Sequence, residues 1–147
     1  MTADPASNPY LSGVMAPVAE EVTAHDLPVT GTLPPELEGR WLRNGPNPHG
    51  SVDPAIHHWF LGDGMVHGVR LRDGKAEWYR NRWVRGTRVA EALGEPAPGG
   101  RSFGDRDFGP NTSVGGFAGR TWAMVEAGTT PMTLTYELDP IGYDDFG

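Results

Sequence analysis

Polar and apolar side chains alternate along residues 65–72, and a second segment, residues 75–84, carries aromatic residues on both of its faces. Alternation with a period of two is typical of a β-strand that buries one face. The Asp73-Gly74 pair between the two segments supplies the positive backbone angles of a tight turn. The sequence therefore predicts an antiparallel hairpin whose second strand is packed between two layers.

The same alternation predicts more strands towards the carboxyl end. Residues 111–126 read as a second hairpin that turns at residues 118–120. On its returning strand, Trp122, Met124 and Glu126 are expected to share one face. Residues 132–138 predict a further strand, which residues 139–142 end. Its inward side chains are expected to be Met132, Leu134, Tyr136 and Leu138.

The amino-terminal residues show little periodicity. Residues 1–12 are small and polar and are expected to form a loose arm, and residues 14–27 are expected to wrap against the main body in an extended conformation. Residues 33–39 begin with two prolines and end with glycine, which predicts a single helical turn. A strand is expected to start at Trp41.

One short helix is predicted between the two hairpins. Thr87 is the expected cap, and Gly94 ends the helix after Leu93. Residues 95–110 are rich in glycine and proline without a period, so they are expected to form a loop.

Composition supports short strands joined by many turns. The chain has 147 residues, of which 21 are Gly and 14 are Pro, with no regular spacing. Short antiparallel strands at this spacing fit either a sandwich or a propeller, and the pattern alone does not choose between them.

Charge and cysteine content exclude several classes of function. A net charge of −7 argues against nucleic acid as a partner, and the one basic run, Arg80, Arg82, Arg85 and Arg88, is interpreted as a solvated strand face. The absence of cysteine excludes disulfides, thiolate metal sites and a cysteine nucleophile, and it suits a cytoplasmic location. No secretory signal or membrane-spanning segment is expected, so the protein should be soluble or at most peripheral to a membrane.

The five histidines, His25, His49, His57, His58 and His67, do not form a metal motif. No pair has the i, i+4 spacing of a helix or the i, i+2 spacing of a strand that aims two rings at one ion. They are interpreted as packing residues, and His67, which shares a face with Met65 and Val69, is expected to make a hydrogen bond inside the core.

Several stretches closely resemble the carotenoid cleavage oxygenases, which are non-haem iron enzymes that split alkene bonds with O2. The central stretch is RNGPNP at residues 43–48, followed by HHWFLGDGMVHGVRLRDGKAEWYRNRWVR at residues 57–85. The resemblance covers nearly the whole chain, and its other stretches are NPYLSGVMAPV, TGTLPPELEGRWLRNGPNP, NTSVGGFAGRTWAMVEAG and DPIGYDDFG. Leu61 is a departure, because many relatives have Asp there.

This resemblance implies an all-β fold, and it favours a propeller over a sandwich. The family fold is a seven-bladed β-propeller with loops and helices that cap one mouth. At roughly 40–50 residues per blade, a chain of this length holds about three blades at most. The expected structure is an incomplete β-propeller, made of the amino-terminal blades with short helices and long loops. Residues 1–30 would form the arm and extended wrap, and residues 31–147 the partial propeller domain.

The resemblance also implies a site. Family members hold Fe(II) with four histidines from different blades, and none of the five histidines here matches such a ligand; the first is expected just beyond residue 147. Glu126 matches a family glutamate that supports an iron-bound histidine by accepting a hydrogen bond from its outer ring nitrogen. From the residues alone, Glu126 is more simply a glutamate that emerges at a strand end. No catalytic residue and no metal ligand is assigned to this chain.

The expected function is therefore that of an amino-terminal segment of a non-haem Fe(II) dioxygenase. The complete enzyme would cleave C=C bonds of carotenoids, apocarotenoids or stilbenes with O2, and this chain alone would hold no iron and be inactive. The alternative is a non-catalytic binding or interaction module derived from a β-propeller, which could self-associate through open sheet edges. A self-contained β-sandwich binding protein is a third possibility.

Overall fold

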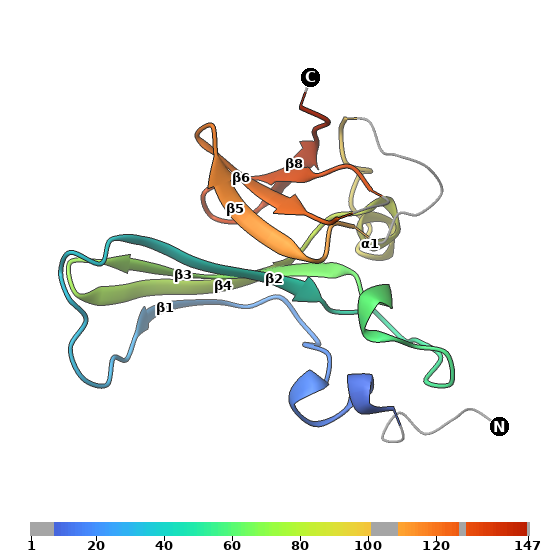
Figure 1. Ribbon diagram of the computed structural model, residues 1–147, viewed down its shortest axis with the longest axis horizontal. Coiled ribbons are helices and arrows are strands. Elements are labelled where there is room, and N and C mark those ends of the chain that lie inside the picture. Colours follow the sequence, from blue (N-terminus) through green and yellow to red (C-terminus); the bar gives the residue numbers. More distant parts are fainter. Residues whose placement is uncertain (1–7, 101–108, 127–128, 147) are drawn as a thin grey trace.

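The computed structural model describes residues 8–100, 109–126 and 129–146, and these form two four-stranded antiparallel sheets (Figure 1). The first sheet has the strand order β1-β4-β3-β2 and the second has the order β5-β6-β7-β8. The strands of the first sheet are β1 (Thr23–Leu27), β2 (Gly39–Pro46), β3 (Gly64–Arg72) and β4 (Lys75–Trp83). Those of the second are β5 (Ser113–Phe117), β6 (Arg120–Met124), β7 (Met132–Leu134) and β8 (Pro140–Tyr143).

Both predicted hairpins are confirmed. Strands β3 and β4 pair from Met65 opposite Trp83 to Arg72 opposite Lys75, and the turn uses positive φ angles of 50° at Asp73 and 70° at Gly74. Strands β5 and β6 form the second hairpin, which turns at residues 118 and 119 with positive φ angles. Both turns therefore lie where the sequence predicted them.

The single long strand predicted over residues 132–138 is wrong. Strand β7 ends at Leu134, and a tight turn leads into β8, which runs back beside it. The turn closes because the Thr135 N–H donates to the Asp139 carbonyl at 2.8 Å and the Leu138 N–H donates to the Thr135 carbonyl at 3.2 Å. Tyr136, at the tip of this turn, is 45% exposed instead of facing inward.

The helical turn predicted over residues 33–39 is also wrong. A β-turn forms instead, in which the Leu37 N–H donates to the Pro34 carbonyl at 3.0 Å. Two consecutive prolines explain the difference, because a residue that precedes proline is driven away from the helical region. The short helix α1 (Thr87–Ala92) does form, with Leu93 as its C-cap and Gly94 following at a φ angle of 70°. Its N-cap is Gly86, not Thr87, and it makes no side-chain capping hydrogen bond.

The amino-terminal segment is better anchored than a loose arm. Its described part contains two 3-10 turns, Pro9–Leu11 and Gly13–Met15, and the Asn8 amide donates to the Pro54 and His57 carbonyls. The expected extended wrap follows and ends in β1, which pairs with β4. The domain boundary expected between residues 30 and 31 stays a prediction.

The main core lies between the two sheets. Val66 of β3 packs with Ala123 and Met132 of the second sheet and with Leu138 of the turn between β7 and β8, and all four are buried. Gly68 leaves room for Leu138, whose Cδ1 would lie 2.9 Å from a Cβ at that glycine. In Figure 1 the second sheet lies against one face of the first. No helix in the described part of the chain has the length and apolar character that crossing a bilayer requires.

Candidate functional site

Glu126 lies just past the end of β6 and is exposed. The expectation that it shares a strand face with Trp122 and Met124 is wrong, because β6 ends at Met124. One carboxylate oxygen, Oε2, accepts a hydrogen bond from the Thr112 hydroxyl at 3.0 Å. The other, Oε1, has no hydrogen-bond partner among the described residues and remains able to accept one.

Sequence reasoning missed Thr112, which lies at the entry to β5. The register pairs Ser113 with Met124, and the Thr112 N–H donates to the Met124 carbonyl at 3.1 Å. These contacts hold Thr112 beside the residues that follow β6. The hairpin register was the signal that could have found the contact between Thr112 and Glu126.

Two buried asparagines fix the backbone that carries Thr112. The Asn44 side-chain amide donates to the Pro110 and Ser113 carbonyls, both at 3.0 Å. The Asn111 amide donates to the Gly62 carbonyl at 2.7 Å. Because buried amides that satisfy backbone carbonyls hold a chain segment in one position, the entry to β5 is a preorganised part of the site.

The RNGPNP stretch therefore connects distant segments. Asn44 ties β2 to the start of β5, and Asn47 ties the amino-terminal wrap to the same stretch. The Asn47 side chain donates to the Val18 carbonyl at 3.0 Å and accepts from the Val18 N–H at 2.7 Å. In the RNGPNP stretch, the glycine and the prolines determine the path of the backbone, and the asparagines make the long-range contacts.

The five histidines lie in separate environments. His25 is exposed on β1, His49 contacts the Trp83 ring edge-on at 4.7 Å, and His58 caps the turn at residues 59–61. His57 is buried, and its carbonyl accepts from Asn8. In the described ranges, no three His, Cys, Asp or Glu side chains are placed to hold a metal ion together.

His67 makes the hydrogen bond that was expected of it, but on an open face. Its Nδ1 lies 2.9 Å from the Tyr79 hydroxyl, and the ring is half-buried instead of lying in the core. Burial lowers the pKa of His67, and the nearby Arg43 guanidinium lowers it further. The imidazole is therefore neutral at pH 7.

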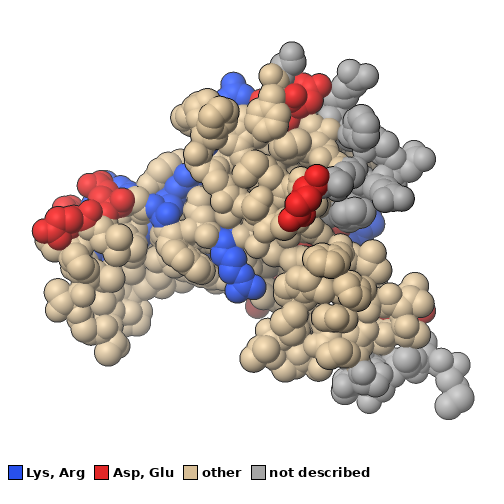
Figure 2. All heavy atoms as spheres, in the orientation of Figure 1, with Lys and Arg blue, Asp and Glu red and all other residues tan. Residues whose placement is uncertain are grey.

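The basic run is not the solvated face that was expected. Arg80 and Arg82 pair with Asp139, Arg85 pairs with Glu21 and Glu95, and Arg88 pairs with the buried Asp63. The side chains of Arg80, Arg82 and Arg85 are largely buried by these contacts. Figure 2 shows the Lys and Arg side chains of the visible face in separate groups on a mostly uncharged surface.

A family model and a known protein with a similar sequence both match most of this chain. The sequence model of a family described as "Retinal pigment epithelial membrane protein" matches residues 15–147. A carotenoid cleavage oxygenase from Mycobacterium tuberculosis is 62% identical over 142 residues, which cover 95% of this chain. The chain spans only 28% of that relative's length.

Solved structures of two oxygenases also match the fold of this chain. The lignostilbene dioxygenase of Pseudomonas brassicacearum matches with a TM-score of 0.78 at 27% identity, over 95% of this chain and 31% of its own. The cobalt-substituted apocarotenoid oxygenase of Synechocystis matches with a TM-score of 0.70 at 28% identity, over 88% of this chain and 30% of its own. The two sheets are thus blades of an incomplete β-propeller, which confirms the expected all-β fold over a closed sandwich.

Proposed function

Because this chain belongs to the family described as "Retinal pigment epithelial membrane protein", we propose that it forms the opening blades of a non-haem Fe(II) dioxygenase. The complete enzyme would cleave a C=C bond of a carotenoid, an apocarotenoid or a stilbene with O2. The single observation that carries this proposal is the 62% identity, over almost the whole chain, to a carotenoid cleavage oxygenase. Two structural neighbours, a lignostilbene dioxygenase and an apocarotenoid oxygenase, support the same class of polyene and stilbene substrates.

The described residues do not fit an iron site by themselves. Their five histidines are dispersed, and no three ligand side chains converge. The iron would be held by histidines from the part of the fold that this chain does not span, and when bound it would supply the activation of O2. This chain would contribute a wall of the propeller and one supporting carboxylate.

Glu126 is the residue that we propose for that support. Its Oε2 is held by Thr112, so the carboxylate has a defined orientation, while Oε1 is free to accept an N–H from an imidazole. A carboxylate in this relation to a metal-bound histidine fixes the ring orientation and its tautomer. Thr112 and Glu126 would then act together, with Thr112 as the positioning residue.

A chimera tests the activity. This chain would replace the aligned segment of the Mycobacterium tuberculosis relative, and the purified, iron-loaded product would be given a carotenoid, an apocarotenoid and a stilbene under O2. Carbonyl products separated by chromatography are the expected result for at least one substrate. A folded, iron-containing chimera that cleaves none of the three would contradict the proposal.

Glu126→Gln in this chimera is expected to lower kcat about 10–100-fold, the usual effect of losing a carboxylate that orients a metal ligand. The melting temperature should not change, because Glu126 is exposed. Glu91→Gln is the matched control, since Glu91 is an exposed glutamate on α1. Equal activity of the Glu126→Gln variant and its control would show that Glu126 does not support the site. A similar fall in kcat for Thr112→Val would support a joint role of Thr112 and Glu126.

The isolated 147-residue chain is expected to bind no stoichiometric Fe(II) and to show no C=C cleavage. The physical reason is that its described side chains offer no convergent set of ligands. Metal content after anaerobic iron loading and desalting, measured by mass spectrometry, tests this. One iron per chain would show that the chain holds the metal itself.

A non-catalytic interaction module is the second candidate, and one observation favours it. Within the described residues, three strands are paired on one side only: β1 and β2 in the first sheet and β5 in the second. Open strands attract further strands. A chimera that folds without activity, together with an isolated chain that associates with itself, would favour this reading.

A further inference from the structure

Asn44 is the one asparagine of the chain that is followed by glycine. An Asn-Gly pair is chemically labile, because glycine has no side chain to keep its backbone nitrogen away from the preceding side-chain amide. The nitrogen can attack that amide and expel ammonia, which converts the asparagine into an acid. Two Asp-Gly pairs, at residues 63–64 and 73–74, have the same open arrangement. The structure distinguishes the Asn-Gly pair from both of them.

The fold requires the glycine of both Asp-Gly pairs but not that of the Asn-Gly pair. A Cβ at Gly64 would lie 2.1 Å from the Pro110 carbonyl oxygen, and Gly74 has a φ angle of 70°. Gly45 has no positive φ angle, and a Cβ there would meet only an Arg43 side-chain nitrogen at 3.9 Å, an ordinary contact. The described structure would therefore accept alanine at position 45, so the labile pair is not imposed by backbone geometry.

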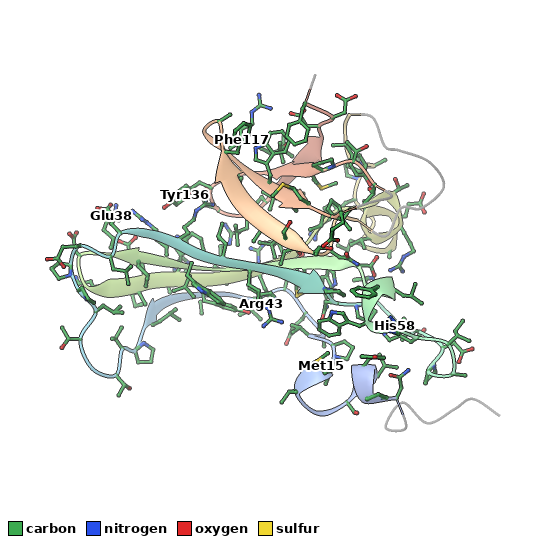
Figure 3. The ribbon with its side chains drawn as sticks, viewed as in Figure 1. Met15, Glu38, Arg43, His58, Phe117 and Tyr136 are labelled. Carbon is green, nitrogen blue, oxygen red and sulfur yellow. The ribbon has the colours of Figure 1, made fainter. Side chains whose placement is uncertain are left out.

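Folding holds the Asn44 amide in a position where it cannot react. Arg43 points away from the second sheet in Figure 3, so Asn44, the next residue of β2, points towards that sheet. Asn44 is 9% exposed, and its amide nitrogen donates to the Pro110 and Ser113 carbonyls, both at 3.0 Å. Ring closure would require the Gly45 nitrogen to reach the side-chain carbon of Asn44. A side chain that is held by two carbonyls of another segment cannot turn back to meet it.

An acid at position 44 would not fit the folded structure. The Pro110 and Ser113 carbonyls accept hydrogen bonds and so do the oxygens of a carboxylate, so both hydrogen bonds of the amide would be lost. The Oδ1 atom of Asn44 is already buried without a hydrogen-bond partner among the described residues. A carboxylate there would therefore be a buried charge without a donor, which strongly destabilises a fold.

We propose that Asn44-Gly45 is a deamidation site that reacts only in the unfolded chain and thereby limits the time in which the chain can fold. The Gly45 nitrogen loses its proton and forms a bond to Cγ of Asn44, the bond between Cγ and Nδ2 breaks, and the side-chain nitrogen leaves as ammonia. Water then opens the succinimide ring to aspartate or isoaspartate. Aspartate brings in the unpaired charge, and isoaspartate also adds one backbone atom to β2, which disturbs its pairing with β3.

The modification would also reach the candidate site. Asn44 holds the segment that carries Thr112, and the Thr112 hydroxyl donates to Glu126. A chain with an acid at position 44 would lose this support. The inference does not depend on the proposed dioxygenase activity, because it follows from contacts and chemistry within this chain. Its consequence is that a chain which stays unfolded too long becomes unable to reach the folded state, as happens when unfolded protein is modified faster than it refolds.

The first test measures the rate of deamidation at residue 44. The chain is incubated at mildly alkaline pH, folded in buffer and unfolded in urea, and mass spectrometry of protease digests gives the deamidated fraction. Deamidation is expected to be at least about tenfold faster in urea, because the folded protein reacts only through rare open states. Gly45→Ala is the matched control: it should leave the melting temperature unchanged and slow the reaction in urea about tenfold or more, because its methyl group hinders ring closure.

The second test measures the ability to refold. Chains held in urea for increasing times are diluted into buffer, and size-exclusion chromatography separates the refolded chains from the rest. The refolded chains are expected to contain Asn44, and the deamidated chains are expected among those that do not refold. Asn44→Asp, which introduces the product directly, should lower the melting temperature by about 10 °C or more.

Equal rates of deamidation in buffer and in urea would overturn the inference. Deamidated chains that refold as well as unmodified ones would also overturn it, and so would an Asn44→Asp variant as stable as the parent. If the isolated chain does not unfold cooperatively, the same measurements are made on the chimera with the Mycobacterium tuberculosis relative. The peptides that contain Asn81-Arg82 and Asn111-Thr112 are internal controls, and they should stay unmodified in urea while residue 44 reacts.

Discussion

Replacing Gly64 by alanine is expected to destabilise the fold by about 3 kcal/mol or more, since a side chain forced into a packed region displaces its neighbours. A Cβ at Gly64 would lie 2.1 Å from the Pro110 carbonyl oxygen and 3.0 Å from a methyl carbon of Val84. The carbonyl is backbone and cannot swing aside as a side chain would. Moving it would also disturb Asn44, which donates to the same oxygen. Urea unfolding followed by tryptophan fluorescence measures the loss.

Gly116→Ala is the control for this prediction. Gly116 lies in β5, has an ordinary φ angle, and has open space where its Cβ would be. The substitution should change the free energy of unfolding by no more than about 0.5 kcal/mol, as for most surface positions. Similar stabilities for the two variants would show that the chain around Pro110 does not approach β3 as closely as described.

Replacing Leu138 by alanine is expected to cost about 2–5 kcal/mol, the range measured for large-to-small changes in cores. Leu138 is 0% exposed and fills the space over Gly68 between the two sheets. Its backbone has a φ of 72°, a conformation that costs roughly 1–2 kcal/mol for residues other than glycine. Leu138→Gly relieves this strain, so it should be less destabilising than Leu138→Ala, although it removes more of the side chain. Chemical denaturation of both variants measures the order.

Ile141→Ala is the matched control for Leu138. It removes an aliphatic side chain of similar size from the second sheet, but Ile141 is 60% exposed. A loss of no more than about 0.5 kcal/mol is expected there. If Leu138→Gly proved clearly worse than Leu138→Ala, the strain at residue 138 would not contribute to stability.

The strands that sequence predicts well are those whose partners are close in the chain. The hairpins β3–β4 and β5–β6 each have alternating side chains and a turn that contains a glycine with a positive φ angle, Gly74 and Gly119. Both signals are local, so they can be read from a short window. The same locality explains why these two hairpins were predicted and the pairing of β1 and β8 was not.

Strand β8 was missed because its sequence looks like a turn. It begins with Pro140 and contains Gly142, both of which usually interrupt strands. Here Pro140 occupies the first position of an edge strand, where a missing N–H is tolerated. Gly142 is required because the Gly99 carbonyl oxygen would lie 2.7 Å from a Cβ there. That close approach depends on a distant segment and leaves no local trace.

The candidate site was only partly predictable. Resemblance to a family singled out Glu126 as a supporting carboxylate, whereas the residues alone suggested a glutamate that emerges at a strand end, and the structure places it exposed just past the end of β6. The contact with Thr112 depends on how the ends of β5 and β6 are paired, which alternation alone does not fix.

The order of strands in the first sheet has a consequence for synthesis on the ribosome. Strand β1 is translated first among the strands but pairs with β4, which is translated after β2 and β3. Because the ribosome adds about 5–20 residues per second, β1 is synthesised seconds before its partner β4. A hairpin such as β3–β4, in contrast, forms within about 10 μs. The nascent β1 must therefore stay unpaired without joining neighbouring chains. Its short length and its exposed His25 and Asp26 suit that wait.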